Sequence, residues 1–236
     1  MPERASPNRS TAVGELSAVM QDYLKQICAA GEWDDVPMTT SRLAGLVGVS
    51  ASTTSEMIRK LATHGLVSHQ PYGTVELTEA GRVAALRMMR RHRLIETYLV
   101  AELGYRWDEV HDEAEILEHA ISDLMLDRID AKLGHPTRDP HGDPIPGPGG
   151  EVNQPDARRL SLLEPGESGV IARISDDDPE MLRYFERLSI GLDQQVLVLR
   201  RLPFGGGTSL RLAADGAELV MGDVATQSIW VTAQKS

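Results

Sequence analysis

The spacing of apolar residues changes once along this chain, and the change limits the folds open to it. Before residue 134, apolar residues recur every three or four positions, which is the spacing of amphipathic helices. After about residue 160 they fall in short runs, such as Val170–Ile174 and Gln195–Leu199, which are typical of strands. Between these parts, the proline- and glycine-rich stretch 134–150 predicts a loop that ends a domain. With 236 residues, the chain is long enough for more than one domain.

Two short helices around a glycine turn predict a helix-turn-helix. Thr39 or Thr40 is placed to cap the first, Gly48 allows a left-handed turn, and Ser50 can cap a second helix over 51–61. The second helix begins with small hydroxyl residues, which suit a recognition helix that enters the major groove of DNA. The alternative is a capped structural helix of a small α domain. The candidate DNA contacts are Thr39, Ser50, Ser52, Thr53, Ser55, Glu56, Arg59, Lys60 and Tyr72.

A hairpin follows the second helix. Leu66–Val67 opens a strand, Pro71 and Gly73 mark a turn, and residues 75–77 return. A hairpin directly after a recognition helix is typical of a winged helix, and a long helix to about Leu99 comes next.

A second pattern joins imidazoles and carboxylates. His111, Glu115 and Glu118 are spaced i, i+4 and i+7 on a helix predicted to continue to about Leu133, and His119 flanks them. His92 and Glu96 are again four residues apart. Such sets bind divalent metals, although a solvated acidic face with incidental histidines explains the first set equally well when it is taken alone.

The acidic charge is concentrated near this pattern. The formal net charge is −11, yet residues 1–100 carry 11 basic and 10 acidic side chains, whereas residues 101–160 carry 6 and 14. Net charge therefore does not exclude DNA binding by the N-terminal part. The lone cysteine, Cys28, excludes an internal disulfide and a cysteine-cluster metal site. No apolar run predicts a membrane span or a signal region, so we expect a cytoplasmic protein.

The C-terminal strands, with a short helix over 178–188, predict a small SH3-like β-barrel. Asp176, Asp177 and Asp178 precede that helix, either as a cap or as donors of an extra metal ligand. His135 and His141 are expected to be loop residues rather than ligands. We therefore predict a mainly α chain with small β parts: a winged helix-turn-helix over 13–77, a helical metal-binding and dimerisation domain over 78–150, and the barrel over 158–234.

These motifs together resemble the diphtheria-toxin-repressor-like family of metal-dependent transcriptional repressors, from about Ser17 to Gly147 and more weakly in the barrel. The segments that carry the resemblance are the helix-turn-helix, Asp22-Tyr23-Leu24, Arg91-His92-Arg93-Leu94-Ile95-Glu96, Val110-His111-Asp112-Glu113-Ala114-Glu115 with Glu118-His119, and Asp143-Pro144-Ile145-Pro146-Gly147.

The resemblance implies two adjacent metals. One would be bound by Asp22, Glu115, Glu118 and His119, and the other by His92, Glu96 and His111. The iron-sensing branch usually has sulfur at the positions of Asp22 and Glu115, so the two carboxylates here resemble the manganese-sensing branch and give an oxygen-rich site suited to Mn²⁺. Lys25 departs from the short manganese sensors, which often have another acid there. The Glu-x-x-Gln of long members is also absent, with Asp176–Asp178 as the potential substitute.

The function implied is that of a homodimeric repressor, not an enzyme, which Mn²⁺ activates to bind double-stranded operator DNA and control manganese homeostasis genes. The alternative within this class is an Fe²⁺-dependent repressor of iron uptake, and Co²⁺ or Zn²⁺ are further ions expected to bind in vitro. A metallohydrolase using His92, His111, Glu115 and His119 is disfavoured, because no His-Glu-x-x-His pattern and no obvious nucleophile are present. A metal-storage module would not need a winged helix.

Overall fold

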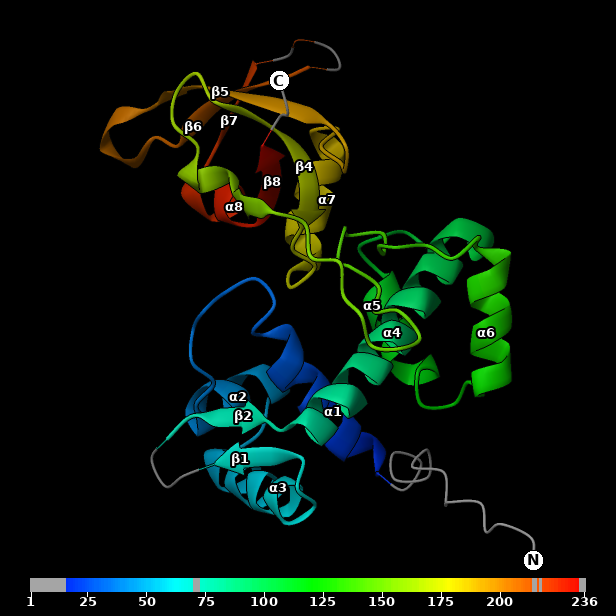
Figure 1. Ribbon diagram of the computed structural model, residues 1–236. Coiled ribbons are helices and arrows are strands. Elements are labelled where there is room, and N and C mark those ends of the chain that lie inside the picture. Colours follow the sequence, from blue (N-terminus) through cyan, green and yellow to red (C-terminus); the bar gives the residue numbers. More distant parts are fainter. Residues whose placement is uncertain (1–15, 70–72, 214–215, 217, 234–236) are drawn as a thin grey trace, which may run out of the picture. The chain divides into compact units, whose positions relative to one another are not determined.

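The computed structural model describes residues 16–69, 73–213, 216 and 218–233, and the chain forms two compact units. One unit comprises residues up to Arg91 with Pro148–Gly150, and the other comprises 92–147 and the residues from 151 onward. The long helix α4 (Glu79–Leu103) passes from the first unit into the second (Figure 1). No helix among the described residues combines the length and apolarity needed to cross a membrane.

The first unit is the predicted winged helix-turn-helix. It contains α1 (Ala18–Ala29), α2 (Thr40–Val47), α3 (Ala51–Thr63) and the antiparallel hairpin of β1 (Val67–His69) and β2 (Val75–Leu77). Thr39 caps α2 by accepting from the Arg42 N–H at 3.2 Å, and Ser50 caps α3 by accepting from the Thr53 N–H at 3.2 Å. Gly48 has a φ of 73°, as the turn requires.

Apolar side chains from every element of the first unit form one core, which fixes α3 on the scaffold. Its buried members are Met20, Tyr23, Leu24, Ile27, Met38, Leu43, Ile58, Leu61, Leu66, Val67, Val75, Ala84 and Ala85. Thr54 on α3 is also fully buried, and its hydroxyl oxygen has no hydrogen-bond partner among the described residues. A buried hydroxyl without a partner is destabilising, because the hydrogen bonds it made to water in the unfolded chain are lost.

We expect Thr54→Val to raise the free energy of unfolding by about 1 kcal/mol, since a methyl group replaces the unsatisfied hydroxyl at similar volume. Thr63→Val is the matched control, because the exposed Thr63 hydroxyl donates to the Arg59 carbonyl within α3; we expect a change below about 0.5 kcal/mol. Thermal unfolding followed by circular dichroism measures both. A Thr54→Val variant less stable than the wild type would contradict the destabilising effect assigned to the buried Thr54 hydroxyl.

The helical part of the second unit contains the rest of α4, α5 (Val110–Leu117) and α6 (Asp123–Lys132). The prediction of one helix from His111 to about Leu133 was wrong. The chain leaves the helix after Leu117 and re-enters it at Ser122, whose extended backbone and hydroxyl cap α6 by accepting from the Met125 N–H at 3.2 Å. The Ser122 capping signal was the feature overlooked in the sequence.

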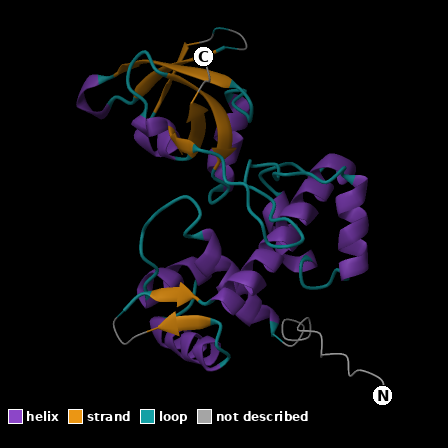
Figure 2. Cartoon of the chain, viewed as in Figure 1, coloured by secondary structure: helices purple, strands orange, loops and turns teal. Residues whose placement is uncertain are grey.

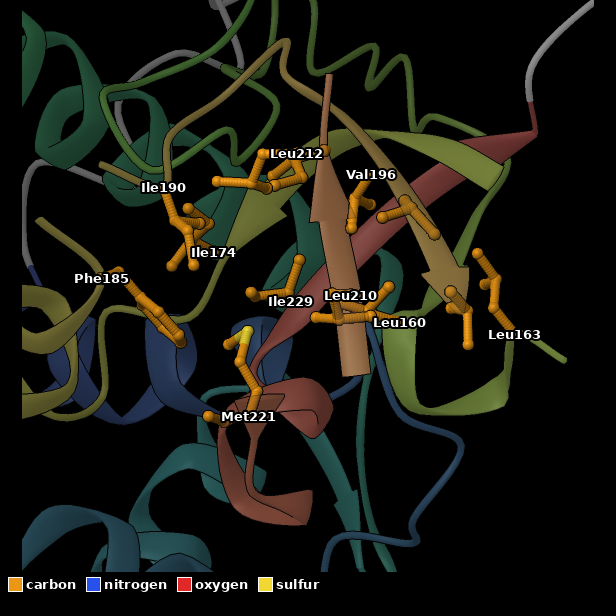
Figure 3. Close-up of a cluster of buried hydrophobic side chains, with 14 of the residues drawn as sticks. Leu160, Leu163, Ile174, Phe185, Ile190, Val196, Leu210, Leu212, Met221 and Ile229 are labelled. Atoms are coloured by element: carbon orange, nitrogen blue, oxygen red, sulfur yellow. The ribbon is translucent and has the colours of Figure 1, made fainter. Parts of the chain in front are cut away.

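The rest of the second unit is the SH3-like barrel, a six-stranded antiparallel sheet in the order β3-β8-β4-β5-β6-β7. Figure 2 shows its strands in orange. Its strands are β3 (Ala157–Arg159), β4 (Ser168–Ile174), β5 (Gln195–Arg201), β6 (Thr208–Leu212), β7 (Glu218–Met221) and β8 (Ile229–Ala233). The predicted helix is α7 (Pro179–Arg187), while the short α8 (Asp223–Gln227) was not predicted. Apolar side chains from the strands and α7, among them Ile174, Phe185, Val196 and Leu210, fill the interior (Figure 3).

The barrel and the helical part of the second unit meet through paired charges and one close backbone approach. Asp108 accepts from Arg183 and Arg106 donates to Glu186. A Cβ on Gly142, whose φ is 96°, would lie 2.1 Å from the Ala172 carbonyl oxygen, so only glycine allows the loop to approach β4 this closely. This contact places the end of β4 beside the loop that follows α6.

Candidate metal centre

His92 and Glu96 occupy one buried face of α4. His92 Nδ1 lies 2.6 Å from Glu118 Oε2, and its Nε2 lies 3.0 Å from Glu96 Oε1. Both contacts can be hydrogen bonds only if the imidazole or one of the two carboxyl groups holds an extra proton, so the three groups together call for one additional positive charge. A divalent cation meets the same requirement with less dependence on pH.

The predicted α5 residues gather around His92. The His111 ring lies edge-on to the His92 ring, with the centroids 4.9 Å apart. Glu115 Oε1 is 3.9 Å from His92 Nδ1 and 3.6 Å from His111 Nε2, and one ligand atom from each of these three residues lies within 4.8 Å of the others. His119 Nε2 is 3.5 Å from Glu118 Oε1. Six of the seven predicted metal ligands therefore form a connected cluster.

A second grouping surrounds Glu96 on the side of the barrel. Glu96, His111 and Asp176 have ligand atoms within 4.8 Å of one another, and so do Glu96, Asp139 and His141. Asp176 follows β4, whereas Asp139 and His141 come from the loop after α6. Glu96 is common to both sets, so three further segments, which carry His111, Asp139 with His141, and Asp176, converge on one buried carboxylate of α4.

Three buried atoms of this second grouping have no hydrogen-bond partner among the described residues: Glu96 Oε2, His111 Nδ1 and His141 Nδ1. His111 Nδ1 approaches Glu96 Oε1 at 3.4 Å without hydrogen-bond geometry. Unsatisfied buried polar atoms are rare and costly, and their convergence fits a bound cation. The donors are carboxylates and imidazoles, which suit Mn²⁺ or Fe²⁺.

The pKa values reflect this crowding. Burial raises the pKa of Glu96, but His92 and His111 lower it by more, so the carboxyl group stays ionised. The Glu96 carboxylate raises the pKa of His111 despite burial. Burial, followed by repulsion from Asp143 and Glu96, raises the pKa of Asp139 to about 8.

The remaining predicted ligands are Asp22 and the three aspartates before α7. Asp22 is on α1 in the first unit, so its part in the centre stays a prediction. Asp177 accepts from the Ser175 hydroxyl at 2.7 Å, and Asp178 caps α7 by accepting from the Glu180 N–H at 2.8 Å. Of the three aspartates, the structure brings only Asp176 to the cluster.

Asp139 and His141 were absent from the predicted ligand set. His141 does lie in the loop, as expected, but its side chain is fully buried and its Nε2 lies 2.7 Å from the Trp107 carbonyl oxygen. The available signal was the run of Asp and His between prolines at 139–144, since polar residues that recur in a loop rigid enough to be buried often serve a site.

The candidate DNA contacts are exposed where the sequence placed them. Thr39 caps α2 and is exposed. The candidates on α3 and at its N-cap are exposed as well: Ser50, Ser52, Thr53, Ser55, Glu56, Arg59 and Lys60. Tyr72 lies outside the described residues.

Comparison with known proteins identifies the combination of a winged helix-turn-helix, a helical metal-binding part and a small barrel. Residues 15–75 match the iron-dependent repressor N-terminal DNA-binding domain, residues 78–147 match its metal-binding and dimerisation domain, and residues 158–233 match the FeoA domain. The chain is 35% identical over 157 residues to the iron-dependent repressor IdeR of Mycobacterium tuberculosis. The aligned stretch covers 64% of this chain and 68% of that protein. The chain belongs to the iron-dependent repressor family. It is a metal-dependent transcriptional repressor, and the family is one of DNA-binding regulators rather than enzymes.

Solved structures agree with the assignment of this repressor. One, a manganese-dependent transcriptional repressor in complex with manganese, is 58% identical with a TM-score of 0.87, covering 91% of this chain and all of that one. The manganese regulator SloR is 30% identical with a TM-score of 0.76, covering 91% of this chain and 98% of that one.

The raised pKa of Asp139 predicts that metal affinity depends on pH. At pH 7 a carboxyl group with a pKa of about 8 is mostly protonated, whereas a metal ligand must be ionised, so binding should release a proton and strengthen as pH rises toward 8. Mn²⁺ titrations at pH 6.5, 7.5 and 8.5 should show this, and the dependence should weaken in Asp139→Asn. Equal pH dependence in both proteins would rule out this role for Asp139.

Proposed function

We propose that this repressor is a homodimer that binds operator DNA when Mn²⁺ occupies two adjacent pockets in each chain. The proposal rests mainly on the buried cluster of carboxylates and imidazoles whose unsatisfied atoms converge beside Glu96. The 58% identical relative is itself described as a manganese-dependent repressor in complex with manganese, which supports the choice of ion.

The first pocket, in this proposal, consists of Asp22, Glu115, Glu118 and His119. The second pocket consists of Glu96, His111, Asp139, His141 and Asp176. His92 lies between the two, with Nδ1 toward Glu118 and Nε2 toward Glu96. The bound ion supplies the positive charge that these buried carboxylates lack.

The switch follows from where the ligands reside. Asp22 is carried by the DNA-binding unit, and Glu115 and Glu118 by the helical part, so their like charges oppose a fixed arrangement until a cation offsets them. A shared ion would then select the arrangement that fits the operator dyad, with the hydroxyl-rich end of α3 and its basic Arg59 and Lys60 toward DNA.

The dimer seam is proposed to include the exposed apolar side chains of α5 and α6. Ile116 is 69% exposed, Leu124 65% and Met125 49%. Large apolar residues left in water on neighbouring helices are typical of an interface. The helical part also matches a dimerisation domain in the family, and a two-fold dimer suits a palindromic operator.

Operator binding with Glu118→Gln tests the proposal. The operator is selected from random duplexes with Mn²⁺-loaded wild type, and binding is followed by fluorescence anisotropy. We expect the wild type to need Mn²⁺, and Glu118→Gln to need about 10–100-fold more, because the substitution keeps the side-chain shape but removes a ligand charge.

Asp112→Asn is the matched control, since it neutralises an exposed acid on α5, the helix that Glu118 directly follows, and should bind like the wild type. Equal, metal-independent binding by the wild type and Glu118→Gln would contradict the proposal.

Iron is the alternative signal, and it is favoured by the name of the 35% identical relative. Fe²⁺ generally binds such sites more tightly than Mn²⁺, so affinity in vitro does not decide between them. We expect a target-promoter reporter in cells to be derepressed when manganese is depleted and to stay repressed when iron alone is depleted. The reverse pattern would assign the protein to iron.

A further inference from the structure

Arg173, the penultimate residue of β4, is a buried cation that contacts several parts of the second unit. Its Nε donates to Asp143 Oδ1 at 2.7 Å, and its guanidinium carbon lies 4.4 Å from the centre of the Trp230 ring. Its Nη2 lies 3.7 Å from Asp176 Oδ1. The side chain is only 9% exposed, so these partners fix its position.

Asp143 also faces a second buried arginine, Arg93 of α4. Arg93 Nη2 lies 3.6 Å from the same Asp143 Oδ1, and Arg93 Nη1 donates to the Pro144 carbonyl at 2.7 Å. Asp139 Oδ1 accepts from the backbone N–H groups of His141 and Asp143, both at 2.9 Å. The loop is thereby held between a helix and a strand.

A local irregularity of the sheet aims Arg173 at this loop. The pairing of β4 with β8 shifts between Ile171 and Arg173, and a bulge of this kind redirects the side chain that follows it. Ala172, at the bulge, presents the carbonyl that meets Gly142. Two residues after Ala172, the Ile174 N–H donates to the His141 carbonyl at 2.9 Å.

Each element in this charge network also carries a ligand of the proposed second pocket. On α4, Arg93 precedes Glu96 by three residues, and after β4, Arg173 precedes Asp176 by three. The loop carries Asp143 together with Asp139 and His141. The network thus fixes the relative positions of three of the four segments that supply the pocket, the fourth being α5 with His111.

We infer that Arg173 and Asp143 are positioning residues that assemble the second pocket by docking the barrel on α4, without binding the metal themselves. The inference rests on the proposed second pocket. Groups that orient metal ligands typically change metal affinity by about 10–100-fold when they are removed.

Mn²⁺ binding by the full-length chain tests this inference, with free Mn²⁺ followed by electron paramagnetic resonance. We expect two classes of site in the wild type. Arg173→Met should weaken one class about 10–100-fold and leave the other within about twofold. Arg173→Lys keeps the charge and the fold but not the fixed planar donor, and should weaken the same class less. The matched control is Arg200→Met, an exposed arginine on β5 of the same barrel, which should change neither class.

A metal-free readout accompanies the titration. Hydrogen exchange in Arg173→Met should be faster at the Asp143 N–H, which donates to Asp139 within the loop, and at the Ile174 N–H, which donates from β4 to the His141 carbonyl. The exchange of α3, in the first unit, should be unchanged.

The double variant Arg173→Met with Asp143→Asn separates positioning from the electrostatic effect of removing the nearer of the two arginines that face the buried Asp143. With both charges removed, the melting temperature should recover relative to Arg173→Met, while the weakened class of Mn²⁺ sites should not. Recovery of metal affinity in the double variant, or two unchanged classes in Arg173→Met, would overturn the inference. A single class of Mn²⁺ sites in the wild type would refute the proposed second pocket itself. This outcome is measured before any variant is compared.

Discussion

The buried carboxylates of Glu96 and Glu118, bridged by His92, are the constraint on which the second unit depends. Both acids are fully buried, and a buried charge is tolerated only when it is paired. His92 and His111 supply partners in the described structure, yet one oxygen of Glu96 and two histidine nitrogens have no hydrogen-bond partner among the described residues. The described fold therefore carries polar groups that a bound cation would satisfy, which is the physical basis of the proposed metal switch.

The barrel is part of this arrangement and not an appendage of the second unit. It supplies Asp176 to the cluster around Glu96, and it is docked by ion pairs, by the Gly142 contact with Ala172, and by Arg173. A barrel held in this way can contribute a ligand with defined geometry, since the donor is positioned by the strand before it rather than by a flexible linker. The loop at 139–143 and the end of β4 supply the additional candidate metal ligands. These two segments are also hydrogen-bonded to each other.

The DNA-binding unit follows a simpler physical rule. Its helices are defined by hydroxyl caps and a left-handed glycine, and its core is a continuous apolar cluster. The exposed side of α3 carries hydroxyl and basic side chains, and the hydroxyl groups hydrogen-bond to one another and to the backbone of the same helix. Recognition surfaces of this kind depend on local sequence, which explains why a short stretch was informative without knowledge of the tertiary contacts.

The sequence by itself determined the local structure and most of the ligand types. The caps at Thr39 and Ser50, the Gly48 turn, the hairpin and the alternating strands are short-range signals, and the spacing of His92 with Glu96 and of His111 with Glu115 places each pair on one helix face. The break at Ser122 was also local, but its capping signal was overlooked in favour of a continuous apolar pattern. Only the tertiary structure decided that Asp139 and His141 join Glu96, that Asp176 rather than Asp177 or Asp178 faces the cluster, and that Arg173 is buried against Asp143. These placements depend on a loop and a strand that are distant in sequence, and no periodicity within either one encodes which of its side chains the other will bury.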